Sequence, residues 1–351
     1  MKFNYDWSLK EATFKKDKGN IFSCFACGGG STMGYKLAGY NVIGINEIDP
    51  KMAEIYIENH NPKYPFIEPI QDFVKRDTFP KELYNLEILD GSPPCSSFSF
   101  VGARDRDWGK EKKFREGQAE QVLDTLFFDF IELASKLQPK VVIAENVKGL
   151  ILGSAKKYVR EIYKDFDKAG YYCQHFLLDA QTMGVPQRRE RVFFICLRKD
   201  LAEPFLHQAT LFDVLPKINL EFKEPTILFK DIADLNDLQE ADNKPETYAL
   251  YNQVKPGRFL REAHPKGYYF QERRLNWDMV CSTIIAGSSG DFHPDVYRRL
   301  NKSELLKASS FPRDYNFLNN IPKYVMGMSV PPLMIAKIVT EVYNQWLSKI
   351  K

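Results

Sequence analysis

One cysteine and one glutamate in this sequence stand where a protein could use them for covalent chemistry. Cys95 follows Pro93 and Pro94 at the end of an apolar segment, and the two prolines restrict the backbone that carries the thiol. Glu145 directly follows the apolar run 141–144. Because a thiol nucleophile needs a nearby group to assist it, a carboxyl group at the same edge of a sheet is a suitable partner. We therefore predict that Cys95 is a nucleophile and that Glu145 faces the same substrate.

A glycine cluster near the start of the sequence predicts a nucleotide site. The segment Phe25-Ala26-Cys27-Gly28-Gly29-Gly30 follows an apolar run and precedes a helical pattern. Glycine allows the backbone to approach a ligand closely, and turns of this kind lie at the carboxyl ends of strands in nucleotide-binding sheets. Glu47, at the end of the next predicted strand, can accept hydrogen bonds from ribose hydroxyls. Taken alone, the glycines are equally compatible with a plain loop and a helix cap.

The elements that must position these residues can be predicted from the hydrophobic pattern. The predicted strands are 21–25, 41–46, 86–90, 141–145, 171–178 and 192–197, and the predicted helices are 50–59, 119–137 and 156–169. This alternation indicates parallel strands joined by crossover helices, which makes an α/β sheet covered on both faces. The run 141–144 is apolar on both sides of the pleat, as expected of a central strand.

The pattern changes at about residue 200. Residues 200–282 contain many Pro, Asn and Asp residues and lack the strand–helix alternation, so we predict a small irregular domain there. Residues 1–199 form the predicted catalytic domain. Residues 283–351 are predicted to return to it and to end in a helix over 333–347, where apolar residues recur at helical spacing.

Composition restricts the class of protein. The chain has 351 residues and a formal net charge of only +3, so nucleic-acid phosphates would have to be met by a local basic cleft. Its six cysteines lack the spacing of a disulfide framework, which indicates free thiols in a reducing compartment. For the isolated pair Cys24 and Cys27 we predict packing and backbone roles rather than a metal site. We predict no signal peptide and no membrane span, and we expect a soluble intracellular protein.

A series of motifs in this order resembles the DNA (cytosine-5)-methyltransferase family over most of the chain. The matching segments are the loop 25–30, the ribose-binding segment 46–49, the adenine contact 71–73, the nucleophile signature Pro93-Pro94-Cys95, the segment Glu145-Asn146-Val147, the Q-x-R-x-R segment 187–191, the segments 299–304 and 311–312, and the closing segment 327–330. The compact chain resembles bacterial or phage enzymes of restriction–modification systems.

The resemblance implies both a fold and a reaction. The fold is the α/β, Rossmann-like fold of S-adenosylmethionine-dependent methyltransferases, with a mostly parallel sheet and a small irregular target-recognition domain. The implied reaction transfers a methyl group from S-adenosylmethionine to C5 of a cytosine flipped out of a specific short sequence in double-stranded DNA, which leaves S-adenosylhomocysteine. Cys95 would add to C6 of the ring while Glu145 contacts N3 and the exocyclic amine. The base must leave the stack to react.

The family's site residues transfer to matching positions. The implied catalytic residues are Cys95, Glu145, Arg189 and Arg191, with Arg191 at O2 of the base and Arg189 supporting the site. The implied cofactor contacts are Phe25, Ala26, Cys27, Gly28, Gly29, Glu47, Ile48, Asp72, Phe73, Ser92, Pro93, Ser329 and Val330, with no metal. The implied DNA contacts are Ser99, Gln187, Arg258, Arg261, Arg273 and Arg274. The alternative for the two catalytic arginines is a solvated turn. Residues 100–118 resemble the family's mobile loop that closes over DNA, and the alternative is a charged surface loop.

Two positions depart from the family pattern. The family usually has glycine where Cys27 stands, so the backbone there must suit a residue with a Cβ atom. It usually has asparagine where Met328 stands, which puts a cofactor hydrogen bond from that side chain in doubt. Neither residue takes part in the chemistry, so we expect activity to survive both departures.

Three other functions are alternatives to the one that this resemblance implies. A tRNA cytosine-5 methyltransferase of the same family would carry a C-F-T element, which Cys281-Ser282-Thr283 matches only in part. A non-catalytic DNA-binding module would not need Cys95 and Glu145, and a nicotinamide-dependent oxidoreductase has no use for them. The expected partners are double-stranded DNA and a cognate restriction endonuclease, and the expected form is a cytoplasmic, nucleoid-associated monomer with no membrane contact.

Overall fold

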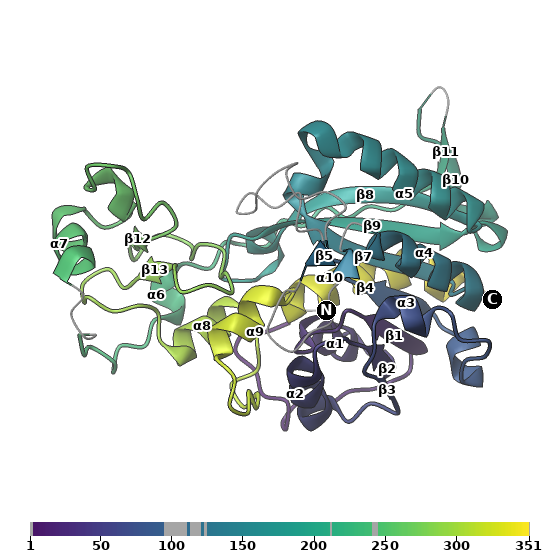
Figure 1. Cartoon of the computed structure of the whole chain (residues 1–351), viewed down its shortest axis with the longest axis horizontal. Helices are drawn as coiled ribbons and strands as arrows, with labels where there is room; N and C mark the ends of the chain where they lie inside the picture. Colours follow the sequence, from purple (N-terminus) through teal and green to yellow (C-terminus); the bar gives the residue numbers. More distant parts are fainter. Residues whose placement is uncertain are drawn as a thin grey trace. The chain divides into compact units, whose positions relative to one another are not determined.

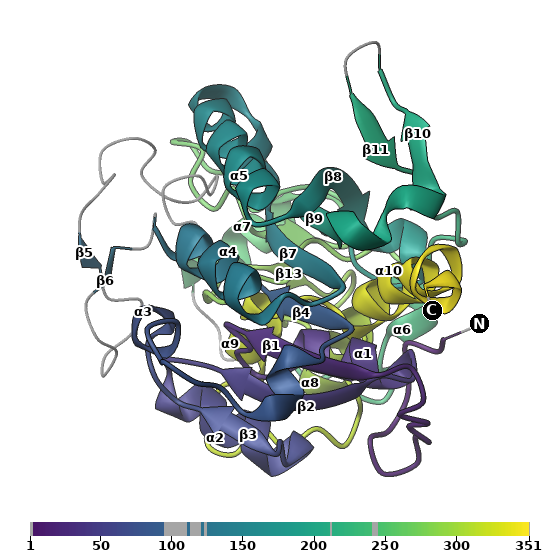
Figure 2. The ribbon, with the colours of Figure 1, turned by 90° about the vertical axis from the view of Figure 1, so that its right-hand side faces the viewer.

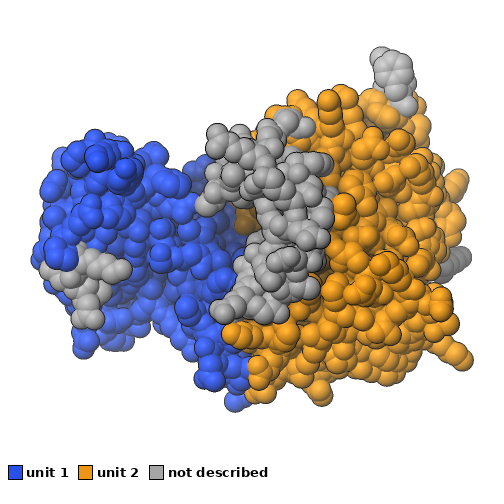
Figure 3. Space-filling view, in the orientation of Figure 1, with its two compact units in different colours: residues 1–13, 179–189, 222–335 blue, residues 14–178, 190–221, 336–351 orange. Residues whose placement is uncertain are grey.

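The computed structural model describes residues 3–94, 111–112, 121–122, 125–210, 213–240 and 245–350. The chain folds into two units, each built from three stretches of sequence (Figure 3). Unit 1 comprises residues 1–13, 179–189 and 222–335, and unit 2 comprises residues 14–178, 190–221 and 336–351.

Unit 2 is built on a seven-stranded sheet (Figures 1 and 2). Its strands are β1 (Asn20–Cys24), β2 (Asn41–Asn46), β3 (Tyr64–Phe66), β4 (Ile88–Gly91), β7 (Val141–Val147), β8 (Tyr171–Asp179) and β9 (Glu190–Arg198). They lie in the order β3-β2-β1-β4-β7-β9-β8. The pairs from β3 to β7 are parallel, and β9 runs antiparallel to β7. The prediction of a mostly parallel sheet is confirmed.

Helices cover this sheet and bury its apolar residues. One core cluster joins Phe22 of β1 and Phe194 of β9 to residues of α3 (Ile70–Phe73), α4 (Leu126–Leu137) and α5 (Lys156–Lys168), which places these helices on one face. The remaining helices of the first half are α1 (Gly30–Leu37) and α2 (Pro50–His60). Helix α2 begins where the Asp49 carboxylate accepts backbone N–H bonds and proline takes the first helical position.

Helix α10 (Pro332–Gln345) ends the main path of the chain. Its second half belongs to unit 2, where the Tyr40 hydroxyl donates a hydrogen bond to the Val339 carbonyl at 3.4 Å. The stretch Pro322–Lys349 is long and apolar enough to cross a membrane, but 72% of its most apolar window is buried inside the protein. Such burial is typical of the core helices of soluble proteins, so the stretch is weak evidence for a membrane span.

Unit 1 has short elements joined by long irregular segments. Its helices are α6 (Phe229–Ile232), α7 (Pro245–Gln253), α8 (Lys302–Ala308) and α9 (Pro322–Met328), and its strands β12 (Arg273–Arg274) and β13 (Asp291–Phe292) form a two-residue parallel pair. Because so few backbone groups pair in regular structure, side-chain hydrogen bonds must do more of the work of holding this unit together.

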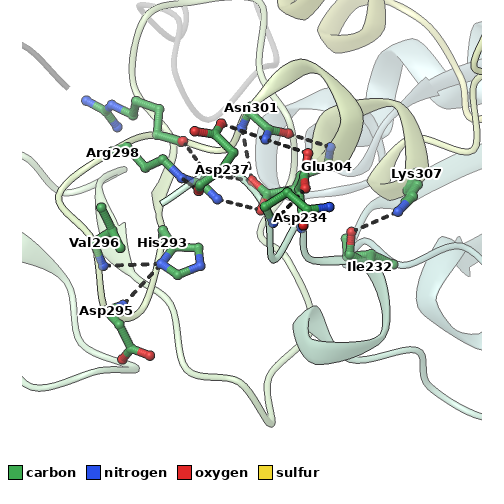
Figure 4. A network of polar contacts seen from close by, with 12 residues as sticks. Ile232, Asp234, Asp237, His293, Asp295, Val296, Arg298, Asn301, Glu304 and Lys307 are labelled. Carbon is green, nitrogen blue, oxygen red and sulfur yellow. Dashed lines mark hydrogen bonds and ion pairs between the residues drawn. The ribbon is translucent and has the colours of Figure 1, made fainter. Parts of the chain in front are cut away.

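A buried polar network supplies many of those bonds (Figure 4). Glu304 is fully buried and accepts two hydrogen bonds from the Arg298 guanidinium, at 2.8 and 2.9 Å. The same carboxylate accepts the backbone N–H groups of Asp234 and Asn301, at 3.1 and 3.0 Å. Asn301 in turn caps α8 by accepting the backbone N–H of Glu304, while its amide donates to Asp237 at 2.8 Å. The network therefore fixes the start of α8 against the segment 234–237.

The structure divides the chain differently from the predicted domains. Residues 200–221 stay with unit 2, where they include the hairpin strands β10 (Leu206–Gln208) and β11 (Val214–Pro216). Residues 283–335 stay with unit 1, which also takes residues 1–13 and 179–189. The sequence pattern does not predict this division, because an irregular segment such as residues 1–13 joins its unit through individual contacts. One of them is the hydrogen bond from the Trp7 indole to the Ser310 carbonyl, at 2.9 Å. The short antiparallel pair β5 (Glu111–Lys112) and β6 (Gln121–Val122) was also not predicted.

Candidate active site

The ends of strands β4 and β7 bring two of the predicted motifs together. The two strands pair in parallel up to the residues that precede each motif. The buried Asn146 side chain then donates a hydrogen bond from Nδ2 to the Pro93 carbonyl at 3.0 Å. Cys95 lies two positions beyond Pro93 and outside the described residues, as does Ser99. The segment that leads to Cys95 is therefore tied to the strand end that carries Glu145.

Glu145 forms a buried ion pair with one of the predicted arginines. Its Oε1 atom lies 2.9 Å from Nε of Arg191, and the residue is 8% exposed. Arg191 extends from the neighbouring strand β9, and its Nη1 also donates to the Glu190 carbonyl at 2.8 Å. Burial lowers the pKa of the Arg191 guanidinium, and the Glu145 carboxylate acts in the opposite direction. The pair holds the Glu145 carboxylate in one orientation at the edge of the sheet.

A second buried carboxyl group, Asp90, lies at the end of β4. Its Oδ2 accepts a hydrogen bond from the Ser23 hydroxyl at 2.6 Å, and its Oδ1 accepts one from the Tyr35 hydroxyl at 2.9 Å. Burial raises the pKa of Asp90 to about 7, although both hydrogen bonds lower it, and the charge of Glu145 raises it further. Sequence reasoning assigned no role to this residue. A carboxyl group that ends an apolar strand was the available signal.

The glycine loop after β1 contains two residues in a backbone conformation that normally favours glycine. Phe25 has a φ of +54° and Cys27 a φ of +47°, both in the left-handed region. Such a conformation costs roughly 1–3 kcal/mol per residue and persists only where the surroundings enforce it. At Cys27 the family usually has glycine, and the positive φ gives the physical reason. The loop is a strained segment rather than a plain turn.

Glu47 helps to hold the loop in this strained backbone conformation. Its Oε2 accepts the Cys27 backbone N–H at 2.7 Å, and its Oε1 accepts the Asp49 backbone N–H at 2.8 Å. Burial raises the pKa of Glu47 to about 7, while hydrogen bonds from the backbone N–H groups of Asp49, Cys27 and Ile48 lower it. The Glu47 carboxylate is thus bonded to the backbone of the loop. Because an ionised carboxylate can accept about four hydrogen bonds, Glu47 keeps capacity for a hydroxyl group.

The other predicted cofactor residues of unit 2 differ in exposure. Ala26 is buried against Ile45 and Tyr56. Ile48 and Ser92 are half-buried, Asp72 is exposed, and the loop glycines are buried. Phe73, in contrast, is fully buried and stacks on Phe22 at 5.5 Å between ring centroids. Its side chain is committed to the core, which leaves the backbone of Phe73 for the predicted cofactor contact.

Gln187 lies in unit 1 and is 1% exposed. Its Nε2 donates to the Ala308 carbonyl at 3.1 Å, and its Oε1 accepts the Ile284 backbone N–H at 3.0 Å. Both ends of the amide are therefore used within the unit. The sequence-based prediction that this side chain contacts DNA is corrected, because its burial leaves no exposed donor or acceptor.

Arg189 also holds unit 1 together. It is 3% exposed, and its guanidinium donates to the carbonyls of Ile284 and Gly327 at 2.9 Å and of Ser329 at 3.0 Å. Ser329 is itself buried, with its hydroxyl bonded to the Val325 carbonyl. The arginine is thus a support for the segment 327–330, in line with the supporting part of its predicted role. Val330 is buried beside it in sequence.

The four arginines predicted to contact DNA separate into two pairs. Arg258 and Arg261 are exposed, and Arg258 has only a long 3.7 Å ion pair with Glu262. Arg273 donates to the Val280 carbonyl at 2.8 Å. Arg274 donates to three backbone carbonyls of its own unit. The first pair is available to a partner, whereas the second serves the internal structure of unit 1.

No metal centre is found among the described residues, where no group of three His, Cys, Asp or Glu side chains could hold an ion. Cys24 is a buried free thiol at the end of β1, and the Cys27 backbone bonds to Glu47. Both observations agree with the packing and backbone roles predicted for this pair.

Comparisons with known proteins bear on the identity of this site. A family model described as C-5 cytosine-specific DNA methylase matches residues 19–344. The Type II methyltransferase M.Sau96I of Staphylococcus aureus is 29% identical over 98% of this chain and 81% of its own length. The Type II methyltransferase M.NgoPII of Neisseria gonorrhoeae is 28% identical over 89% of this chain and 91% of its own. A crystal structure of a Spodoptera frugiperda DNMT2 mutant shares the fold, with a TM-score of 0.61 at 17% identity over 93% of this chain and 99% of its own.

Proposed function

Because the chain belongs to the C-5 cytosine-specific DNA methylase family, we propose that it methylates a cytosine flipped out of double-stranded DNA through a covalent bond to Cys95. Cytosine-5 methylation of DNA is the activity of the family, and the Type II relatives place the chain among methyltransferases of restriction–modification systems. Beyond this activity we propose the methyl donor, S-adenosylmethionine, the nucleophile, Cys95, and the roles of individual residues.

The observation that carries the proposal is the hydrogen bond between Asn146 and the Pro93 carbonyl. It joins the nucleophile signature to the strand end that bears Glu145, whose carboxylate is held by Arg191 at 2.9 Å. To be methylated at C5, a cytosine ring needs a nucleophile at C6 and a hydrogen-bonding group at N3 and the exocyclic amine. The first motif carries the nucleophile, Cys95, and the second carries the hydrogen-bonding group, Glu145. Chemistry of this kind depends on groups that are fixed before the substrate arrives.

In the proposed reaction, the Cys95 thiolate forms a bond to C6 and pushes electron density to C5. Glu145 hydrogen bonds to N3 and the exocyclic amine, which stabilises the charge that develops on the ring. After C5 has accepted the methyl group, the C5 proton leaves to a base, the C5–C6 double bond re-forms and the Cys95 sulfur departs. We assign Arg191 to orienting Glu145 and to contacting O2 of the ring.

The residues around the loop 25–30 fit S-adenosylmethionine, which would supply the methyl group. Glu47 can still accept a hydrogen bond from a ribose hydroxyl. It is bonded to the backbone N–H of Cys27, and the glycines that follow Cys27 have no side chains to keep a ligand away from the backbone. Phe25 is half-buried at the turn, so its ring can flank an apolar part of the donor. We further propose that Ser329 and Val330 contribute their backbone, because the Ser329 hydroxyl is already bonded to the Val325 carbonyl.

We propose that DNA is bound through exposed cations of unit 1. Arg258 and Arg261 are exposed there, and phosphate contacts from such cations supply affinity without reading sequence. Flipping the target base costs a few kcal/mol, which these contacts must offset. A cognate endonuclease, monomeric action and a cytoplasmic location follow from the restriction–modification setting. The tRNA alternative is not favoured, because the matching family model is that of DNA methylases and the DNMT2 likeness shows the fold alone.

The test is expression in a host without DNA methylation, followed by bisulfite sequencing of its DNA. Wild-type protein should protect cytosines in one recurring short context, and Cys95→Ser should protect none. Cys173→Ser, a change at a buried cysteine of β8, serves as the matched control and should protect as wild type does. A duplex with 5-fluorocytosine at the target should trap a protein–DNA adduct only while Cys95 is present, since fluorine cannot leave as the C5 proton does. Fully converted DNA from folded protein would refute the proposal.

A further inference from the structure

Unit 1 contains a cavity that the proposed chemistry does not use. Its volume is about 790 Å³, which lies within the usual range of ligand pockets. Residues from four segments of unit 1 line it, among them Glu246, Tyr269, Glu272, Ser288 and Arg299. All of the lining residues that the structure describes belong to this unit.

Glu272 is the chemically unusual residue of this cavity. It is 6% exposed, and its Oε1 accepts a hydrogen bond from Nη2 of Arg299 at 2.6 Å. Its Oε2 has no hydrogen-bond partner among the residues that the structure describes. A buried carboxylate oxygen without a partner is unfavourable, and nearly all such atoms in native proteins are paired. Oε2 therefore calls for an N–H or O–H donor beyond those that the described residues supply.

Arg299 cannot supply that second bond. Its Nη1 donates to the Gly290 carbonyl at 2.6 Å, and the guanidinium lies 4.0 Å above the Phe292 ring. These contacts fix the guanidinium, which in turn fixes the Glu272 carboxylate through Oε1. The free oxygen is thereby held in one position, as a recognition group needs to be.

The walls of the cavity favour a flat ring as the donor. Tyr269 and Tyr297 are held by hydrogen bonds, the first to Glu246 at 2.8 Å and the second to Thr247 at 2.5 Å. Phe270 is 57% exposed and also lines the cavity. Aromatic side chains pack well against planar rings, in offset-stacked or edge-to-face arrangements. The same unit carries the exposed cations that we assign to DNA phosphates.

We propose that this cavity reads one base of the DNA target through its exocyclic amino group, with Glu272 as the acceptor. The inference rests on the proposed function and names a residue that sets sequence specificity. A carboxylate accepting from cytosine N4 is a known form of base readout, and adenine N6 and guanine N2 offer the same kind of donor. The base is identified by its amino group, and the three possible sources are separated by experiment.

The experiment measures kcat/KM for DNA methylation on duplexes in which one base near the target cytosine lacks its amino group. Pyrimidin-2-one replaces cytosine, purine replaces adenine, and hypoxanthine replaces guanine, one position at a time. For wild-type protein, removal of one particular amino group should lower kcat/KM about 5- to 150-fold. In Glu272→Met the same removal should have less than about a threefold effect, because the acceptor is already gone. Glu262→Met, an exposed acid outside the cavity, should retain the full wild-type penalty.

Two outcomes separate the failure of this inference from that of the proposed function. If wild-type protein methylates no defined sequence, the proposed function fails. If it methylates a defined sequence and Glu272→Met shows every amino-deletion penalty unchanged, the inference is overturned. Should Glu272→Met fail to fold, Ser288→Trp decides instead. This exposed position lines the cavity, so a bulky ring there should abolish the same penalty without disturbing the core.

Discussion

Replacing Arg298 with methionine tests whether unit 1 depends on its buried polar network. The guanidinium gives Glu304 two of its four hydrogen bonds, and Glu304 is fully buried. Methionine fills a similar volume but leaves the carboxylate with only two backbone donors. Breaking a buried ion pair from one side costs about 3–5 kcal/mol, because an uncompensated charge stays inside. Since a typical domain is stable by about 5–15 kcal/mol, this single change should remove a large part of the stability of unit 1.

Urea denaturation and native-state hydrogen exchange measure the effect. Exchange should speed up across residues 222–335, while the amides of β1, β4 and β7 in unit 2 keep their protection. Arg258→Met is the matched control. Its ion pair with Glu262 is 3.7 Å long, and the side chains are 67% and 41% exposed, so its loss should cost no more than about 1 kcal/mol.

The double variant Arg298→Met/Glu304→Gln tests whether the cost of Arg298→Met comes from the buried charge of Glu304. A neutral amide no longer leaves a charge buried, so the double variant should be more stable than Arg298→Met alone. Equal costs for Arg298→Met and Arg258→Met, or a double variant that is weaker still, would refute the reasoning. Either result would mean that the pair is hydrated in solution.

Three further predictions concern single positions. Gly327→Ala should destabilise unit 1 by at least about 1–3 kcal/mol, because a Cβ atom there would lie 2.3 Å from the Ala286 backbone nitrogen; thermal unfolding measures this. Glu47→Gln should weaken S-adenosylmethionine binding in calorimetry at least about tenfold, because one amide oxygen cannot accept both backbone N–H groups, that of Cys27 included. Asp90→Asn should flatten the pH dependence of stability. Burial raises the pKa of Asp90 from 3.8 to about 7, so its contribution is full below about pH 4 and is lost as the pH rises through 7, a loss on the order of 4 kcal/mol.

Each of these predictions has a control. Gly170→Ala changes a glycine with no atom within 4 Å of the added carbon, and its positive φ measures backbone strain without a clash. Glu54→Gln, on the exposed side of α2, should leave cofactor binding unchanged. For Asp90→Asn, chemical denaturation at pH 4 and pH 7.5 gives the slope directly. An unchanged slope would mean that Asp90 is ionised in the native protein.

The sequence predicted the sheet well because buried parallel strands are continuous apolar runs. Val141–Ala144 is such a run, and its pairing with β4 lies where the pattern placed it. The predicted ends of the two strands, at residues 90 and 145, lie one and two positions before the observed ends at Gly91 and Val147. The strained backbone at Cys27 could only be suspected from a departure at one position, and the φ of +47° came from the structure.

The polar residues of unit 1 could not be interpreted from the sequence. Gln187 and Arg189 resemble site residues by motif, yet their partners are backbone carbonyl and N–H groups about 95 to 140 positions away. A motif gives no information on which distant backbone groups a side chain will meet. Arg258 and Arg273 likewise look alike in sequence, and only tertiary contacts separate an exposed cation from a partly buried support.

The way the chain alternates between units has a consequence for synthesis on the ribosome. Unit 1 takes residues 1–13 but needs residues up to 335, and the sheet of unit 2 still awaits residues 336–351 after unit 1 is complete. Trp346, fully buried, belongs to this late stretch of unit 2. Unit 2 therefore cannot finish folding until residues 336–351 have been synthesised, and pairing across so long a separation is slow. The nascent chain should depend on chaperones that shield the exposed apolar surface of unit 2 until then, and a stop codon at position 336 should damage this unit as much as an early one.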